Sequence, residues 1–373
     1  MEPRDLSAHV AYQAGRGIEE VARELGTDPD DLVKLASNEN PFGPSPAAVD
    51  AIRDAAGNAS TYPKASHTDL TARLADRWNV ESEQVWLANG GDGALDYLSR
   101  AMLDPGDTVL VPSPGFAYYG MSARYHHGEV NEYRLSAEDG FSLTADTVLS
   151  QYDGERIVYL TSPHNPSGGR FSLDAVTKIA DETDEETLVL VDEAYGEYAD
   201  GPSAVSLLAE RDDSDTPAGV SGNHAVRDDV AVLRTFSKAY GLAGVRLGYA
   251  VVPEEWADAY ACVNTPFAAS ELACRGGLAA LTDDEHVEKS VGTARWAREY
   301  IYETLDAPTW ESHGNFVLAE VGDASAVAEA VQERGVILRD CTSFGLPDCV
   351  RITCGTKDET RRAVRELNEV LSS

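Results

Sequence analysis

The sequence predicts an α/β protein with a large domain built on a mainly parallel β-sheet and a smaller α+β domain that follows it. Short apolar runs rich in β-branched residues recur between stretches of helical pattern, and most are far enough apart to leave room for a helix. Such runs are typical of strands that are buried on both faces of a parallel sheet. Six of them are predicted strands: 84–88, 107–111, 156–160, 187–191, 230–235 and 245–252.

The last two of these strands are separated by too few residues for a helical crossover, so one should be antiparallel or lie at an edge. After Pro253 a helical pattern dominates to about residue 308. Short apolar runs then alternate with helical segments and predict the small domain, with strands in 315–321, 335–340 and 349–356 and a last helix in 359–371. The polar segment 210–229 is a predicted surface loop.

Acidic side chains are in large excess over the 373 residues of the chain. There are 64 Asp and Glu against 30 Lys and Arg, a formal net charge of -34, and only six residues are lysine. Such a field repels nucleic-acid phosphates, which argues against a nucleic-acid-binding function. The acidic residues are spread along the chain, as in proteins from high-salt cytoplasm, where screening weakens self-repulsion. An acidic face for a basic partner is the alternative, but it would favour one localised block.

The five cysteines form no CxxC pair, and an odd number cannot all pair within one chain. They fit a reduced cytoplasm. The N-terminus has no apolar signal region, and no stretch of 18 apolar residues occurs in the sequence. We therefore expect a cytoplasmic protein that is neither secreted nor membrane-spanning.

Candidate functional residues follow the predicted strands, where ligands bind in sheets of this kind. The motif ANGGDG follows the strand at 84–88, and its glycines let backbone N–H groups, including those of Gly91 and Asp92, approach an anion at a helix start. A tight turn is the simpler reading of the same residues. Asn165 lies in the loop TSPHNPSGG after the strand at 156–160, where a plain turn cluster is the alternative.

Two further strand ends carry charged groups. Asp192 comes directly after the strand at 187–191, and Tyr195 comes three residues later. The Asp192 carboxylate could cap the next element or be a buried partner for a cationic heteroaromatic ring. Lys238 follows the strand at 230–235, and Arg246 comes eight residues later. A nearby cation and burial would help an imine-forming lysine to lose its proton. The alternative, a pair of solvated helix charges, is weakened by the scarcity of lysine.

These strand ends together supply the groups that one cofactor requires. Lys238 could bind an aldehyde, Asp192 could hold a ring nitrogen, and Asn165 and Tyr195 could donate to a phenolic oxygen. Arg246 could hold a phosphate with Thr235 and Ser237. Pyridoxal 5'-phosphate has this set of features. The sequence therefore predicts a pyridoxal-phosphate enzyme.

Motifs along nearly the whole chain resemble the fold type I, pyridoxal-phosphate-dependent aminotransferases of class I/II, and within them the histidinol-phosphate branch. The resemblance is carried by LASNENPFGPSP, STYP, GGDGALDYL, PSPGFAYY, SPHNPSGG, VDEAY, RTFSKAYGLAGVRLGY, GVILRD and CVRITCGT. It implies a seven-stranded, mainly parallel sheet in the large domain. It also implies an N-terminal arm (1–45) that packs with the small domain and the partner subunit, a large cofactor-binding domain (46–265), and a linking helix with the small domain (266–373).

The resemblance implies a role for each matching residue. Lys238 binds the cofactor and moves the proton between the substrate and cofactor carbons, while Asp192 keeps the pyridine nitrogen protonated. Asn165 and Tyr195 donate to the phenolic oxygen, and Phe116 stacks on the ring. The phosphate is held by backbone at Gly91 and Asp92 and by Thr235, Ser237 and Arg246. Tyr62 reaches into the partner's site, so a homodimer is implied.

Substrate recognition is expected from Arg339 and Arg351, because guanidinium groups suit both a carboxylate and a phosphate. Tyr12, Asn38, Tyr62 and Asn315 are candidate substrate-binding residues. Each could instead be an ordinary surface or turn residue, and for Asn38 and Asn315 the two readings are equal alternatives. Two positions depart from the family pattern. Phe116 stands where many relatives have tyrosine, and His164 stands where asparagine is common.

The expected reaction converts histidinol phosphate and 2-oxoglutarate into imidazole-acetol phosphate and glutamate in L-histidine biosynthesis, by a ping-pong mechanism. An aromatic or broad-range aminotransferase, or a phosphoamino-acid decarboxylase on the same scaffold, is the close alternative. A non-catalytic half of a transcription regulator would need a DNA-binding domain, for which the chain has no spare length or basic patch. A purely structural acidic protein would leave Lys238, Asp192, Asn165 and Arg246 unexplained.

Overall fold

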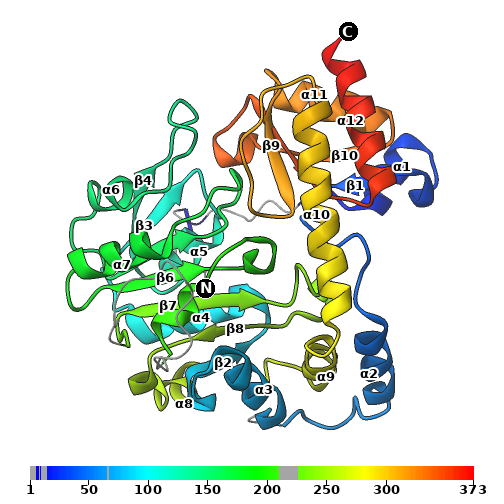
Figure 1. Cartoon of the computed structure of the whole chain (residues 1–373). Coiled ribbons are helices and arrows are strands. Elements are labelled where there is room, and N and C mark those ends of the chain that lie inside the picture. Colours follow the sequence, from blue (N-terminus) through cyan, green and yellow to red (C-terminus); the bar gives the residue numbers. More distant parts are fainter. Residues whose placement is uncertain (1–5, 8, 10–14, 65–66, 210–225) are drawn as a thin grey trace, which may run out of the picture.

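Two β-sheets organise the chain, and a long helix, α10 (Asp284–Thr304), runs between the regions that they occupy (Figure 1). The computed structural model describes residues 6–7, 9, 15–64, 67–209 and 226–373. Tyr12 and most of the predicted loop 210–229 lie outside these residues. In the part of the chain that is described, no helix is both long and apolar enough to cross a membrane.

The large sheet has seven strands in the order β2-β8-β7-β6-β5-β3-β4. Only β8 runs antiparallel to its neighbours, and it lies between β2 and β7. The predictions of a mainly parallel seven-stranded sheet and of one antiparallel strand are confirmed. The strands are β2 (Val85–Ala88), β3 (Thr108–Ser113), β4 (Glu129–Arg134), β5 (Ile157–Thr161), β6 (Leu188–Asp192), β7 (Val230–Thr235) and β8 (Gly248–Val251).

One strand of this sheet carries no apolar signal in the sequence. β4 reads EVNEYR and lies at the sheet edge, and Tyr133 is its one fully buried side chain. The strand predicted at 245–252 is also shorter than expected. Its first residues form a turn in which Arg246 has a left-handed φ of 57°, so pairing with β7 begins only at Gly248.

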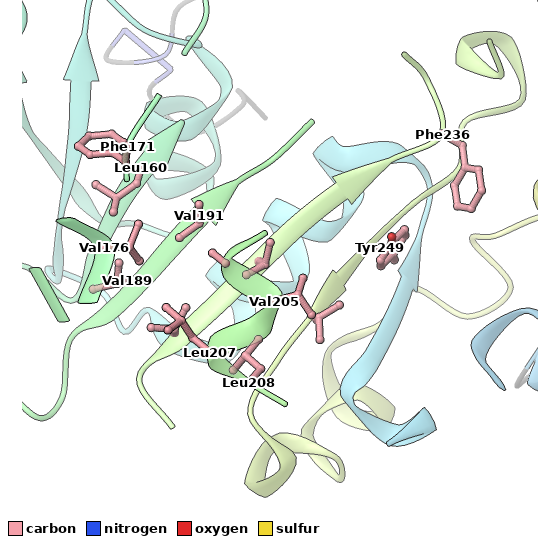
Figure 2. Close-up of a cluster of buried hydrophobic side chains, with 14 of the residues drawn as sticks. Leu160, Phe171, Val176, Val189, Val191, Val205, Leu207, Leu208, Phe236 and Tyr249 are labelled. Atoms are coloured by element: carbon pink, nitrogen blue, oxygen red, sulfur yellow. The ribbon is translucent and has the colours of Figure 1, made fainter. Parts of the chain in front are cut away.

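Helices cover both faces of the large sheet because the strands are apolar on both faces. In β5, β6 and β7, alternate residues enter two different hydrophobic clusters. Figure 2 shows one of them, where Leu160, Val189 and Val191 lie among residues of neighbouring segments such as Val176. The helices of this domain are α2 (Pro46–Ala56), α3 (Thr68–Trp78), α4 (Gly90–Met102), α5 (Tyr118–Tyr125), α6 (Ala145–Leu149), α7 (Leu173–Glu182), α8 (Ala259–Val263) and α9 (Glu271–Ala280).

The small sheet has the order β1-β10-β11-β9 and includes a strand from the N-terminal segment. β1 (Val33–Leu35) pairs in parallel with β10 (Val336–Asp340), which in turn pairs antiparallel with β11 (Cys349–Thr353). β9 (Phe316–Glu320) closes the sheet, and α1 (Ile18–Leu25), α11 (Ala324–Glu333) and α12 (Lys357–Leu371) lie on this side of the molecule (Figure 1). The domain limits at residues 45 and 265 stay a prediction.

Candidate active site

The carboxyl ends of β5, β6 and β7 bring the predicted cofactor residues to one edge of the large sheet. Asp192 is opposite Thr161 on one side and Leu233 on the other, so the segments after these three strands begin at the same level. Asn165 follows β5, Tyr195 follows β6 and Lys238 follows β7. Because the strands are parallel, side chains that are distant in sequence meet there.

Asp192 is a buried carboxylate that accepts two hydrogen bonds. The hydroxyl of Tyr119 donates to its Oδ2 over 2.7 Å, and the backbone N–H of Ala194 donates to Oδ1 over 2.9 Å. Burial raises the pKa of Asp192 to about 6, and these two hydrogen bonds oppose the shift. A cation placed beside Asp192 would therefore offset the energetic cost of burying the charged carboxylate.

Lys238 lies among cations in a half-buried position. Its Nζ donates to the carbonyl oxygen of Ser37 over 3.3 Å and lies 5.6 Å from the centre of the Tyr195 ring. Burial, followed by the charges of Arg351 and Arg246, lowers its pKa to about 8. A lysine with this pKa has a useful fraction of free amine near neutral pH.

The start of α4 and the turn at Arg246 form a cradle for an anion. Gly90 has a φ of 76°, and a Cβ atom added there would collide with the Arg246 guanidinium. A Cβ on Gly248 would come within 2.5 Å of the Gly90 backbone. Both glycines are therefore required for Arg246 to lie against the N-terminus of α4, where backbone N–H groups of Gly91 and Asp92 face outward from the helix.

Arg246 connects the polar residues of this cradle. Its guanidinium forms an ion pair with Asp92 (3.0 Å) and donates to the hydroxyl of Ser237 (3.4 Å). Thr235 donates to the same Ser237 hydroxyl over 3.0 Å. The structure thus brings together all the residues predicted for the phosphate: Gly91, Asp92, Thr235, Ser237 and Arg246.

Two arginines lie side by side on the small sheet. Arg339 of β10 and Arg351 of β11 are directly opposite each other in the antiparallel register, so they share one face. Both guanidinium groups lie near the ring of Phe344, at 5.5 Å and 5.9 Å from its centre. Arg351 also donates to the side-chain oxygen of Asn165, which links this face to the end of β5. The pair forms a cationic wall beside the cofactor residues.

Residues 36–38 connect the arginine, the lysine and the tyrosine. The carbonyl of Ala36 accepts a hydrogen bond from Arg351 (2.9 Å), and the next carbonyl, of Ser37, accepts the one from Lys238. The side chain of Asn38 donates to the hydroxyl of Tyr195 over 3.0 Å. Asn315 donates to the backbone oxygen of Asn38 and, like Asn38, is only 1% exposed. Both asparagines therefore lie behind the site and hold its other residues.

The loops that carry Phe116 and Asn165 are joined by His164. Its Nε2 lies 3.0 Å from the carbonyl oxygen of Pro114, and its Nδ1 lies 2.8 Å from the hydroxyl of Ser167. A carbonyl only accepts, so Nε2 carries the proton and Ser167 donates to Nδ1. Burial lowers the pKa of His164 to about 4, so the ring is neutral near pH 7. Phe116 itself packs edge-on against Tyr119.

Tyr62 is the predicted site residue that lies apart from this group. Its side chain is 80% exposed and stacks on the ring of Phe267, which is also exposed. Four contributors were not found by sequence reasoning: Tyr119, Phe344 and the backbone carbonyls of Ala36 and Ser37. Tyr119 lies within the motif PSPGFAYY and could have been suspected, whereas a backbone carbonyl has no sequence signal.

In the described residues, no group of three or more His, Cys, Asp or Glu side chains could hold a metal ion.

Comparison with known proteins finds relatives that match over nearly the whole chain. Residues 30–367 match the family model for aminotransferase class I and II. The chain is 72% identical to the histidinol-phosphate aminotransferase of Haloarcula marismortui and 68% identical to that of Natronomonas pharaonis, covering 100% of this chain and at least 99% of each relative.

A solved structure is similar over the same length. Histidinol-phosphate aminotransferase from Sinorhizobium meliloti, in complex with pyridoxal-5'-phosphate, matches with a TM-score of 0.85 and 25% identity, covering 99% of this chain and 97% of that one. With the family model and the close relatives, these likenesses lead to one conclusion: the chain belongs to the aminotransferase class I and II family.

Proposed function

We propose that the chain is a pyridoxal-phosphate-dependent histidinol-phosphate aminotransferase of L-histidine biosynthesis. Histidinol phosphate gives its amino group and leaves as imidazole-acetol phosphate, and 2-oxoglutarate then collects the group as glutamate. The observation that carries the proposal is that Lys238 and Asn165, at one edge of the large sheet, meet Arg351 of the small sheet, with the lysine pKa at about 8. The names of the full-length relatives support the choice of substrate.

The residues at the site fit pyridoxal 5'-phosphate. Lys238 would hold its aldehyde carbon and Asp192 its ring nitrogen, while Asn165 and Tyr195 would donate to the phenolic oxygen and Phe116 would lie against the ring. The cradle of Gly91, Asp92, Thr235, Ser237 and Arg246 would hold the phosphate. When bound, the cofactor supplies an electron-withdrawing ring for the substrate carbon that loses its proton.

The chain's own groups supply the proton transfer and the electrostatics. Lys238, as a free amine, accepts the proton from the substrate carbon and returns it to the neighbouring cofactor carbon. Its lowered pKa suits this role, because the free amine is then present near neutral pH. Asp192 holds the positive charge on the ring nitrogen, and its burial strengthens that interaction. Tyr119 and Ala194 keep the carboxylate oriented.

Arg339 and Arg351 serve both half-reactions. Histidinol phosphate brings a phosphate and no carboxylate, whereas glutamate brings two carboxylates, so one cationic wall must bind different anions. Guanidinium forks can bind either kind in a bidentate manner. The cross-strand arrangement over Phe344 presents two forks on one face.

The active unit is a homodimer in the cytoplasm. The exposed pair of Tyr62 and Phe267 supports a protein partner at this surface, because large aromatic side chains are rarely left in water together. Tyr62 would then complete the site of the partner subunit. A mixture of Lys238→Ala and Tyr62→Ala subunits tests this. Mixed dimers should regain activity at the one site that has both residues; no recovery would show that Tyr62 acts within its own subunit or not at all.

The substrate is tested by single half-reactions in high salt without a keto acid. The cofactor-loaded protein is mixed separately with histidinol phosphate, glutamate, phenylalanine and threonine phosphate, and the loss of visible cofactor absorbance is followed. Histidinol phosphate and glutamate should each convert the cofactor, and Lys238→Ala should not respond at the parent rate. Conversion by phenylalanine without conversion by histidinol phosphate would favour an aromatic aminotransferase. Release of carbon dioxide from threonine phosphate would favour a decarboxylase.

A further inference from the structure

Asn38 is buried between the two domains and hydrogen-bonds residues of both. Its backbone N–H donates to Oγ1 of Thr353 at the end of β11 (3.0 Å), and its backbone oxygen accepts from Asn315 just before β9 (3.0 Å). Its side-chain nitrogen donates to the hydroxyl oxygen of Tyr195, which follows β6 (3.0 Å). Asn38 has a φ of 53°, a left-handed conformation that asparagine adopts more readily than most residues.

These hydrogen bonds have a defined direction. The Thr353 oxygen accepts from the Asn38 backbone, and its own proton is donated to Oδ1 of Asn38, 3.1 Å away. With the amide oxygen toward Thr353, the NH2 group of Asn38 faces Tyr195. Since the Tyr195 oxygen accepts that bond, its own hydroxyl proton remains to be donated to another group.

We propose that Asn38 and Thr353 are positioning residues that direct the Tyr195 hydroxyl toward the phenolic oxygen of the cofactor. The proposal rests on the proposed function, in which Tyr195 donates to that oxygen. Thr353 donates to Asn38, Asn38 donates to Tyr195, and Tyr195 donates to the cofactor, so each hydrogen bond polarises the next. Because Thr353 belongs to the small sheet and Tyr195 to the large domain, the placement of the two domains sets the strength of this donation.

Three charged groups surround Tyr195, and each affects the pKa values of Tyr195 and of a cofactor bound beside it. Arg351 and Asp192 act on it electrostatically, and Nζ of Lys238 lies 5.6 Å from its ring centre. The variants below change none of these charges. A difference in titration between parent and variant therefore reports the hydrogen-bond chain.

The test is a spectrophotometric pH titration of the cofactor-loaded protein in high salt. A hydrogen bond donated to the phenolic oxygen withdraws negative charge from it. The nitrogen that joins Lys238 to the cofactor then holds its proton less tightly, so its pKa is lower. Thr353→Val keeps the side-chain shape but removes the hydroxyl, so the apparent pKa of the visible band should rise by roughly half a pH unit. Thr353→Ser should restore the parent value. Asn38→Gly, which tolerates the left-handed conformation, should produce a rise at least as large.

Tyr195→Phe separates this role from a structural one. Without the phenol there is no hydroxyl to direct, so Thr353→Val should cause no further shift in that background. The proposal is overturned by an equal shift with and without Tyr195, or by no shift in both Thr353→Val and Asn38→Gly. Failure of the proposed function would look different, because the parent itself would then show no lysine-bound chromophore, and both proposals would fall.

Discussion

The hydroxyl group of Tyr119 lies 2.7 Å from Oδ2 of Asp192 and donates a hydrogen bond to it. The same hydroxyl lies 2.8 Å from Oγ1 of Thr161 on the neighbouring strand. Both Tyr119 and Asp192 are buried, so the phenol offsets part of the cost of burying the carboxylate. In the proposed function, this pair sets how well Asp192 can hold a cationic ring nitrogen.

Replacing Tyr119 by Phe should weaken cofactor binding. A hydrogen bond to a charged group contributes about 1.5–3 kcal/mol, so affinity for pyridoxal 5'-phosphate should fall at least about tenfold at pH 7.5. Fluorescence titration of the cofactor-free protein measures this. Tyr118→Phe is the matched control, because the Tyr118 hydroxyl donates to Asp96 instead (3.1 Å). Equal affinities for parent and Tyr119→Phe would refute the assigned role.

The raised pKa of Asp192 also predicts a pH dependence for the cofactor-free protein. Between the unfolded value of 3.8 and the folded value of about 6, the folded state binds more protons than the unfolded state. The free energy of unfolding should therefore gain from this group as the pH falls from about 6 to about 4. Urea denaturation across this range should show the gain in the parent and lack it in Asp192→Asn; identical pH profiles would contradict the shift.

His164 should matter for cofactor binding without touching the substrate. His164→Leu removes the hydrogen bond to Pro114, which joins the loops of Phe116 and Asn165, and the hydrogen bond to Ser167 within the loop of Asn165. Cofactor affinity should fall about tenfold at pH 7.5, since each bond contributes about 1 kcal/mol. His164→Asn keeps a donor and an acceptor and should lose less. Because the folded pKa is about 4, this histidine stabilises the fold above its unfolded value of 6.5 and loses that contribution as the pH falls toward 4. Parent-like affinity in His164→Leu would rule out the coupling.

Lys238 should react with amine-directed reagents at a lower pH than an exposed lysine. Labelling of the cofactor-free protein at a series of pH values, followed by mass spectrometry, should give Lys238 a midpoint near its pKa of about 8. Lys178 is an internal control, because its hydrogen bond to Asp146 raises its pKa above the usual value of 10.5. The same midpoint for both lysines would mean that burial and Arg351 do not activate Lys238.

Salt should stabilise the protein. The net charge of -34 causes self-repulsion, which screening reduces as the Debye length falls from about 10 Å at 0.1 M to about 3 Å at 1 M salt. The melting temperature should therefore rise between these KCl concentrations. Sucrose is uncharged and screens no charges, so it should raise the melting temperature less than KCl does at the same concentration. A melting temperature that falls in molar KCl would contradict the electrostatic explanation.

The sequence predicted the strands that are buried on both faces, since their apolar runs are continuous. It missed β4, whose side chains point mostly into solvent at a sheet edge, and β1, which has three residues and, among the residues that the structure describes, pairs only with β10. These two strands exist because of neighbours that are remote in sequence. Local patterns carry no information about such pairing.

The candidate site was accessible to sequence reasoning where chemistry-bearing residues lie at the end of a strand or within a few residues after it, as Asp192 and Lys238 do. Contacts that depend on packing between remote segments were not accessible. The carbonyl of Ser37 meets Lys238 from 201 residues away, and Asn38 meets Thr353 from 315 residues away. The sequence offered Asn38 only as a substrate-binding residue or a turn residue, whereas its hydrogen bonds connect both domains.

Full turnover tests the central claim most directly. The purified protein, in high salt, is given histidinol phosphate and 2-oxoglutarate, and mass spectrometry follows glutamate and imidazole-acetol phosphate. We predict equal amounts of both products from the parent and a loss of turnover in Lys238→Ala. Absence of both products while phenylalanine and 2-oxoglutarate give glutamate, or parent-like turnover in Lys238→Ala, would contradict the account.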